Sequence, residues 1–529
     1  SLTSLRLDYN SIQGSGEAFG EALKMNSSLK ELSMVSCFLD TEDGKGLATG
    51  IAVTSSLSSL NLDINNIRGS GEAFGAALKT NSSLKELSLG NCSLNAADGK
   101  GLAAGLAENT SLTVVNLLSN NFDTAAAAAL LKVKQEHAKL TTLCGFTEGG
   151  LTEEEDDKND EDTEEQDDKN AKDQGRTIDL CGDNLGPADA MLIAPEISVM
   201  TWLTSLRLGS NFLKEEGIIT IIDALQSNKE LELLSLDISS NDFNFGPIEE
   251  KLVAATLAMM PSLTSLRLDY NSIQGSGEAF GEALKMNSSL KELSMVSCFL
   301  DTEDGKGLAT GIAVTSSLSS LNLDINNIRG SGEAFGAALK TNSSLKELSL
   351  GNCSLNAADG KGLAAGLAEN TSLTVVNLLS NNFDTAAAAA LLKVKQEHAK
   401  LTTLCGFTEG GLTEEEDDKN DEDTEEQDDK NAKDQGRTID LCGDNLGPAD
   451  AMLIAPEISV MTWLTSLRLG SNFLKEEGII TIIDALQSNK ELELLSLDIS
   501  SNDFNFGPIE EKLVAATLAM MPSLTSLRL

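Results

Sequence analysis

The feature that most constrains this chain is a perfect tandem repeat. Residues 262–522 repeat residues 1–261 letter for letter, and residues 523–529 begin a third copy. The chain starts and stops on the same heptapeptide, so we expect it to be a window on a longer array. Tandem repeats specify an elongated molecule whose modules pack against their neighbours. We therefore expect two modules, residues 1–261 and 262–522, followed by the start of a third at 523–529.

A shorter period runs inside each copy, where successive units open on Ser-Leu at positions 1, 28, 56, 83 and 111. Each unit follows the pattern L-x-x-L-x-L-x-x-(N/C)-x-L, which the first unit fills with Leu2, Leu5, Leu7, Asn10 and Ile12. Further units open near Leu203 and Leu233. This is the pattern of a leucine-rich repeat, and we expect roughly 16 to 18 repeats in all.

The pattern has a simple physical meaning. The L-x-L segment alternates apolar and polar residues, as a short half-buried strand does. The apolar residues Ala18, Phe19, Ala22 and Leu23 then follow at helical spacing, and Asn26 stands where that helix must stop, as Asn81 and Asn109 do in later units. We therefore predict an α/β solenoid of horseshoe form, with short parallel strands on the concave face and helices on the convex face.

The turn position of the pattern alternates between two residue types. Asn10, Asn65 and Asn120 alternate there with Cys37 and Cys92. Together with the length of the units and their Ala-rich helices, this alternation resembles the ribonuclease-inhibitor type of leucine-rich repeat. That type also occurs in nucleotide-binding immune sensors and in the GTPase-activating protein for the small GTPase Ran. The resemblance covers nearly the whole chain except its acidic inserts, and it implies a fold rather than a function.

The charge of the chain restricts its partners. A net charge of −43 argues against nucleic acid and anionic membranes as partners. The sequence contains no run of 18 apolar residues, so we expect no membrane-spanning helix. The eight cysteines contain no C-x-x-C pair, so we expect reduced, packed thiols in an intracellular, cytoplasmic setting. The sequons at Asn26, Asn81, Asn91 and Asn109 are interpreted mainly as helix-end residues rather than as glycan sites.

One stretch in each copy breaks the rhythm, at residues 153–175 and again at 414–436. It holds 13 acidic and three basic residues, a net charge of −10 from 3 − 13. With almost no apolar residue it cannot offset the entropy of ordering, so we expect a disordered loop. The loop has three possible roles: a solubilising insertion, a bait for basic partners, or a calcium site. The calcium site is disfavoured because an EF-hand loop that started at Asp157 would have Asp162 at its sixth position, where Gly is needed.

The sequence offers no catalytic machinery. There is no Walker motif, nucleophile elbow or metal-spaced cluster, so we expect no enzyme activity, no cofactor and no metal site. The only histidines are His137 and its copy His398, expected at the surface end of a helix. The segment 14–20, Gly-Ser-Gly-Glu-Ala-Phe-Gly, superficially echoes a phosphate loop. It recurs at 69–75, two units further on, so we interpret it as repeat architecture.

Partners that dock on the concave side would meet the polar residues around L-x-L. Interfaces depend on Tyr, Trp and Arg anchors, and among these positions only Arg6, Tyr9 and Arg207 qualify in each copy. The predicted binding residues are Arg6, Asp8, Tyr9, Glu31, Asn61, Asp63, Asn116 and Arg207, with their copies Arg267, Asp269, Tyr270, Glu292, Asn322, Asp324, Asn377 and Arg468.

Our preferred hypothesis is a non-enzymatic scaffold that binds a protein partner on its concave face or through its acidic loops, with a basic partner expected for the loops. Two alternatives stay open: a regulatory GTPase-activating module of the Ran type, and a purely structural array. In the Ran-directed family the acidic stretch follows the solenoid as a tail, whereas here it interrupts the repeats. No residue-by-residue match to that family's catalytic loop can be made, so no catalytic residue is carried over from it. The sequence does not indicate an oligomeric state.

Overall fold

The computed structural model describes residues 2–147, 150–151, 176–242, 260–408, 411–412, 438–502 and 523–528. Both acidic inserts, 153–175 and 414–436, lie outside the described residues. The hypotheses about those loops therefore stay predictions. Across the described part of the chain, no helix is long and apolar enough to cross a membrane.

The chain divides into two compact units. Unit 1 comprises residues 1–245 and 265–272, and unit 2 comprises 246–264 and 273–529. The division falls near the boundary between the two sequence copies. The first strand of the second copy pairs with the last strand of the first copy and groups with unit 1.

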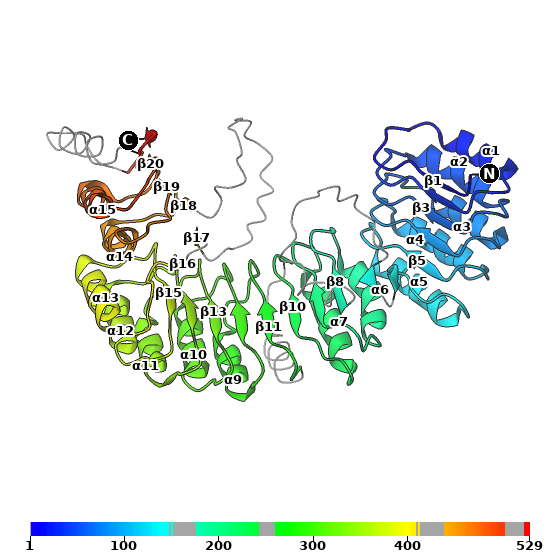
Figure 1. Ribbon diagram of the computed structural model, residues 1–529. Helices are drawn as coiled ribbons and strands as arrows, with labels where there is room; N and C mark the ends of the chain where they lie inside the picture. The colour runs from blue at the N-terminus through cyan, green and yellow to red at the C-terminus, as the bar shows by residue number, and fades with distance from the viewer. Residues whose placement is uncertain are drawn as a thin grey trace. The chain divides into compact units, whose positions relative to one another are not determined.

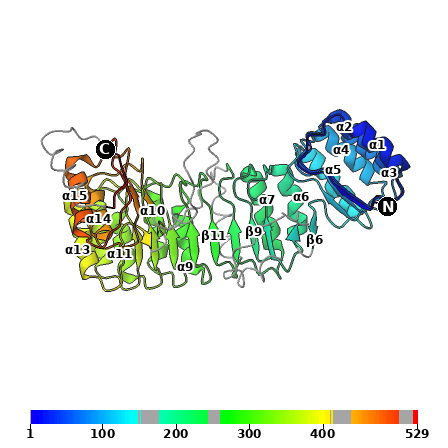
Figure 2. The same cartoon turned by 45° about the horizontal axis from the view of Figure 1, so that its top comes forward.

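In unit 1, each regular repeat folds as a strand, a loop and a helix. The first sheet is parallel and keeps chain order: β1 (Ser4–Arg6), β2 (Glu31–Ser33), β3 (Ser59–Asn61), β4 (Glu86–Ser88) and β5 (Val114–Asn116). The helices that follow these strands are α1 (Gly16–Met25), α2 (Thr41–Ile51), α3 (Gly71–Thr80), α4 (Ala96–Leu106) and α5 (Thr124–Glu136). The strands lie on one side of the unit and the helices on the other (Figures 1 and 2).

Beyond α5 the pattern is interrupted and then resumes. The short strands β6 (Phe146–Thr147) and β7 (Gly150–Leu151) pair antiparallel. A second parallel series then contains β8 (Thr177–Asp179), β9 (Ser205–Arg207), β10 (Ser235–Asp237) and β11 (Ser265–Arg267). Its helices are α6 (Pro187–Ile197) and α7 (Lys214–Ser227).

Unit 2 repeats this plan. Its parallel strands are β12 (Glu292–Ser294), β13 (Ser320–Asn322), β14 (Glu347–Ser349) and β15 (Val375–Asn377), then β18 (Thr438–Asp440), β19 (Ser466–Arg468), β20 (Ser496–Asp498) and β21 (Ser526–Arg528). Its helices are α9 (Gly277–Met286), α10 (Thr302–Ile312), α11 (Gly332–Thr341), α12 (Ala357–Leu367), α13 (Thr385–Glu397), α14 (Pro448–Ile458) and α15 (Lys475–Ser488), and β16 (Phe407–Thr408) pairs antiparallel with β17 (Gly411–Leu412). The predicted α/β leucine-rich-repeat solenoid is confirmed.

The leucines of the pattern form the core. Leu32, Leu60 and Leu87 lie opposite one another on successive strands and are at most 2% exposed. Burying a leucine side chain stabilises the fold by roughly 1.5–3 kcal/mol. Because every repeat contributes such residues to a shared interior, each repeat is stable only against its neighbours.

Where the turn residue of the pattern is Asn, this buried side chain can join its repeat to the one before it. The Asn65 Nδ2 donates to the carbonyls of Met34 and Leu62, both at 2.8 Å. Its Oδ1 accepts the backbone N–H groups of Cys37 and Leu39 of the preceding repeat, both at 3.0 Å. The asparagines predicted to end the helices act similarly: Asn81 caps α3, and its Oδ1 accepts from Leu84 N at 2.8 Å.

The glycine-rich segment 14–20 proves to be a helix-packing motif. A Cβ on Gly16 would lie 2.2 Å from the Cα of Asp43, and one on Gly20 would lie 2.1 Å from the carbonyl oxygen of Gly46. The absence of side chains lets α1 and α2 approach at backbone distance. The Asp43 carboxylate then accepts from the N–H groups of Gly16 at 2.7 Å and Gly14 at 2.9 Å. Asp98 repeats this bridge to α3.

A buried polar cluster joins α6 to the repeat before the acidic insert. Glu196 of α6 is 4% exposed and forms a 2.7 Å ion pair with Lys134 of α5. Its carboxylate also accepts from Thr142 Oγ1 and from the N–H of Leu143, both at 2.7 Å. All of its oxygens therefore have partners, as a buried carboxylate requires. The cluster holds the two parts of the unit together where the regular ladder of strands is broken.

Asp189 of α6 contributes to the same junction. Its carboxylate accepts from the N–H of Ser119 at 2.9 Å and from the N–H of Gly186 at 2.8 Å. Burial raises its pKa from 3.8 to about 7, although the backbone hydrogen bonds from Gly186 and Ser119 oppose the shift. Asp450 occupies the equivalent place in unit 2, and burial raises its pKa to about 7 as well.

We predict that replacing Asn65 and its copy Asn326 with Ala lowers the free energy of unfolding by about 2–5 kcal/mol, because two buried N–H donors per site lose their acceptor. Urea denaturation followed by circular dichroism measures the loss. The matched control is Asn66→Ala with Asn327→Ala, since Asn66 is the exposed neighbour, and it should shift stability by no more than about 0.5 kcal/mol. Equal losses in both variants would contradict the assigned role.

We predict a pH-dependent contribution from Asp189 and Asp450. Their folded pKa lies above the unfolded value of 3.8, so this contribution is present below pH 3.8 and is lost as pH rises through about 7. The loss is of order 4 kcal/mol per site at most. The prediction is tested by measuring melting temperatures between about pH 5 and about pH 8. The natural chain is compared with a variant that carries both Asp189→Asn and Asp450→Asn. The natural chain should lose more stability than the variant, and parallel pH profiles would contradict the prediction.

Candidate interaction surface

The strand face consists of the outward side chains of each strand and of the residue two positions beyond it. In the first repeat these are Ser4, Arg6 and Asp8. Parallel pairing aligns the equivalent residues of neighbouring repeats, so the predicted binding residues fall into columns across the sheet. The side chains on this face differ in how far the scaffold already engages them.

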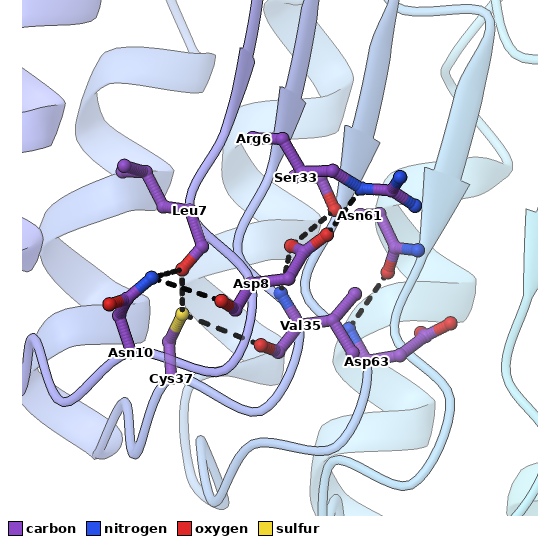
Figure 3. Close-up of polar contacts among 9 residues, drawn as sticks. All are labelled: Arg6, Leu7, Asp8, Asn10, Ser33, Val35, Cys37, Asn61 and Asp63. Carbon is purple, nitrogen blue, oxygen red and sulfur yellow. Dashed lines mark hydrogen bonds and ion pairs between the residues drawn. The ribbon is translucent and has the colours of Figure 1, made fainter. Parts of the chain in front are cut away.

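Arg6 and Asp8 are tied to the next repeat (Figure 3). The Arg6 Nε lies 2.6 Å from Asp8 Oδ2. The other oxygen of Asp8 accepts from Ser33 Oγ at 2.6 Å and from the N–H of Val35 at 2.8 Å. The Asp8 side chain is only 8% exposed, whereas that of Arg6 is 55% exposed. Asp8 is therefore a link between β1 and β2, and Arg6 is the accessible member of the pair.

Asp63 forms the same kind of link two repeats later. Its carboxylate accepts from Ser88 Oγ at 2.6 Å and from the N–H of Gly90 at 2.5 Å. The side chain of Asn61 accepts from the N–H of Asp63 at 2.9 Å, and Asn116 accepts from the N–H of Leu118 at 3.2 Å. These three predicted binding residues hold the strand ends in place.

Charges alternate along the second part of the strand face of unit 1. Asp179, Arg207, Asp237 and Arg267 stand opposite one another on β8 to β11. The Arg207 Nη1 lies 2.7 Å from Asp179 Oδ2, and Arg267 pairs at 2.7 Å with the buried Asp269. This charge ladder is internally neutralised, so it offers an incoming partner little uncompensated charge.

Glu31 differs from the other predicted residues. It is exposed on β2, and no described residue forms an ion pair with it. Glu86 on β4 has the same exposure and the same lack of an ionic partner among the described residues, although the list of predicted sites omits it. It takes the place of Glu31 two repeats further on, so the alternation of the repeats could have identified it. These two glutamates are the most accessible carboxylates of the first sheet.

Tyr9 lies in the loop after β1 rather than on the strand. It is 68% exposed, with a left-handed backbone at φ 58°. Its copy Tyr270 is 47% exposed at φ 55°. Both side chains are thus largely open to solvent, at the border between the strand face and the loops that lead to the helices.

The copies in the second half follow the same division. Asp324 accepts from Ser349 Oγ at 2.6 Å and from Asn377 Nδ2 at 3.2 Å, and Asn322 accepts from the N–H of Asp324 at 3.0 Å. Arg468 pairs with Asp440 at 2.5 Å. Glu292 is exposed on β12, without an ionic partner among the described residues.

The cysteines and histidines act as packing residues. All eight cysteines are free thiols, and Cys37 and Cys92 are fully buried, as predicted. His137 corrects the expectation of a surface histidine. It caps α5, is partly buried, and its Nε2 lies 2.7 Å from the carbonyl oxygen of Asn109. Its Nδ1 accepts from the N–H of Leu140 at 2.9 Å. The imidazole is therefore fixed within the scaffold.

We predict that Asp63→Ala with Asp324→Ala lowers the unfolding free energy by about 1–3 kcal/mol, because the partly buried N–H of Gly90 and hydroxyl of Ser88 lose their acceptor. Chemical denaturation measures the change. The control is Glu86→Ala with Glu347→Ala, which alters exposed carboxylates of the same face and should leave stability within about 0.5 kcal/mol. A neutral result for Asp63 would mean that its hydrogen bonds add nothing to the scaffold.

No protein-family model matches the chain. Among curated proteins, it is similar to NACHT, LRR and PYD domains-containing protein 14 of Mus musculus, with 25% identity over 315 residues, or 59% of this chain. It shares 32% identity with mouse NACHT, LRR and PYD domains-containing protein 5 over 223 residues, or 41% of this chain. The ribonuclease inhibitor of Sus scrofa is 26% identical over 326 residues, or 58% of this chain.

The chain spans 28% and 19% of the lengths of those two NACHT proteins and 66% of the porcine inhibitor. It therefore corresponds to a part of each relative. The printed names of the two NACHT proteins contain LRR, the abbreviation of leucine-rich repeat, and the structure of this chain displays such repeats as alternating parallel strands and helices. The repeat geometry and these similarities together identify the chain as a leucine-rich-repeat protein of the ribonuclease-inhibitor type.

Proposed function

We propose that this chain is a non-enzymatic scaffold that binds a basic protein segment on its strand face. The observation that carries the proposal is the pair Glu31 and Glu86, exposed on alternate strands of a chain whose net charge is −43. Two strand spacings separate these strands, or roughly 10 Å. An extended or helical segment with two Lys or Arg residues could contact both carboxylates.

Electrostatic attraction would raise the association rate and the selectivity of such a complex more than its affinity. Each exposed ion pair contributes about 0.2–1 kcal/mol, and salt screens it over about 10 Å at 0.1 M. Other parts of the face are less available, because the charge ladder neutralises itself and Asp63 is bound to Ser88 and Gly90. The region around β2 to β4 is therefore the proposed contact area in unit 1. Glu292 and Glu347 provide the same residues in unit 2.

The proposal predicts that panning a random dodecapeptide phage library on the immobilised chain enriches Lys- and Arg-containing peptides. Replacing the strand-face glutamates with Gln should weaken the binding of these peptides roughly three-fold or more, as measured by fluorescence anisotropy. Raising the salt concentration from about 0.05 to about 0.5 M should weaken peptide binding further. The strand-face variant changes Glu31, Glu86, Glu292 and Glu347.

A matched control removes the same number of charges from the first turns of the helices, through Gln substitutions at Glu17, Glu72, Glu278 and Glu333. It should bind the peptides as the natural chain does. Equal weakening in both variants would reduce the effect to net charge and contradict the proposal. A chain lacking residues 153–175 and 414–436 should also keep binding, and loss of binding there would move the interaction to the acidic inserts.

A further inference from the structure

Exposed aromatic side chains gather in one class of loop. Among the described residues, every aromatic side chain exposed to solvent lies between the end of a strand and the start of the next helix. These residues are Tyr9, Phe38, Phe212, Tyr270, Phe299 and Phe473. In a chain with only 4% aromatic residues, this distribution concentrates the side chains best suited to anchor an interface.

Three of the exposed apolar side chains fall on consecutive repeats of unit 1. Tyr9 and Phe38 are each 68% exposed, and Ile64 is 45% exposed. Backbone hydrogen bonds join the three loops in succession, since Tyr9 N donates to Val35 O at 2.8 Å and Ser36 N donates to Asp63 O at 3.0 Å. The positions of Tyr9 and Ile64 are separated by two strand spacings, roughly 10 Å, with the repeat of Phe38 between them. We call these three residues the apolar edge.

The fold does not require these side chains. Tyr9 and Ile64 both have φ 58° and Phe38 has φ 57°, a left-handed conformation that is rare for β-branched and bulky residues. In the other described repeats of the first sequence copy, the position of Tyr9 and Ile64 is filled by the small residues Ser36, Asn91, Ser119, Gly182, Ser210 and Ser240, all at positive φ. Small residues thus satisfy the same turn without exposing apolar surface. Strain combined with exposure indicates a role in binding.

The surroundings of the apolar edge define its partner. Asp8 and Asp63 directly precede Tyr9 and Ile64, and Asp40 follows two positions after Phe38. Two arginines lie near these loops. Arg6 is already paired with Asp8, and Arg68 is exposed in the loop after Ile64. With a net charge of −43 on the chain, a second copy would meet strong repulsion. A partner with apolar side chains flanked by Lys or Arg fits both the chemistry and the charge.

We propose that the apolar edge of Tyr9, Phe38 and Ile64 is the anchor site for that partner, which inserts apolar side chains there while its cations meet Glu31 and Glu86 on the strand face. This inference rests on the proposed strand-face function and extends it from the sheet to the loops. In this arrangement the loop residues provide most of the binding affinity, and the strand glutamates select for a positively charged partner.

The test uses the full chain and the Lys- and Arg-containing peptides selected on it. The edge variant changes Tyr9, Phe38 and Ile64, together with their copies Tyr270, Phe299 and Ile325, to Ser. We expect the peptide Kd to rise at least ten-fold and the melting temperature to stay equal or increase, because Ser fills this turn in other repeats. The control variant changes exposed apolar residues at or just after the C-terminal ends of helices to Ser, namely Met25, Val53 and Val199 with their copies Met286, Val314 and Val460. It should bind normally.

Each other outcome overturns the inference. Peptides that bind the edge variant as tightly as the natural chain would show that the edge is not an anchor, even if the glutamate variant still weakens them and the strand-face function stands. A large fall in melting temperature would assign the side chains to folding. Sedimentation showing self-association that only the edge variant abolishes would make a second copy the occupant. Selected peptides without Lys or Arg would overturn the proposed function itself, and with it this choice of partner.

Discussion

The structure depends on buried amides at the Asn turns of the pattern. Asn65 accepts two backbone N–H groups of the repeat before it and donates to carbonyls of both repeats, and Asn120 does the same. Short strands leave many backbone groups in their loops without sheet partners, and unsatisfied buried groups are costly. The asparagines satisfy them, and the leucines beneath can then stack in register. Where Cys replaces Asn, as at position 37, the thiol donates to the carbonyl of Leu7 at 3.0 Å, so alternate turns need fewer amides.

Carboxylates supply the second set of links between repeats. Asp43 and Asp98 bridge the beginnings of neighbouring helices, while Asp8 and Asp63 bridge the ends of neighbouring strands. These aspartates are therefore structural. On the strands of the first sheet, Glu31 and Glu86 are the carboxylates that stay exposed for an external partner. This division separates the part of the surface that maintains the fold from the part proposed to bind.

The sequence predicted the fold well because its signal repeats. The spacing of Leu, Asn and Cys determines which side chains point inward, and the structure agrees at nearly every repeat. The same spacing could not show that Asp8 bonds to Ser33 and Val35, because that contact depends on the residues of the next repeat. Nor could it predict the link between Glu196 and Lys134, which lies where the pattern fails. Of the candidate binding residues, Arg6, Tyr9 and Glu31 are exposed, whereas Asp269 is buried, and this engagement with the scaffold appeared only in three dimensions.

The close approach of α1 and α2 limits how such an array can lengthen. Gly16 and Gly20 on one helix face Gly46 and Gly50 on the next, and a Cβ on any of them would collide with backbone. Adjacent repeats are therefore two different halves of a pair, and α3 and α4 form the next pair with Gly71 and Gly75 against Gly101 and Gly105. Inserting or deleting a single repeat would bring two like halves together. Growth or loss in whole pairs of repeats would preserve these glycine contacts, so the doublet is the smallest unit by which this part of the chain can lengthen without steric conflict.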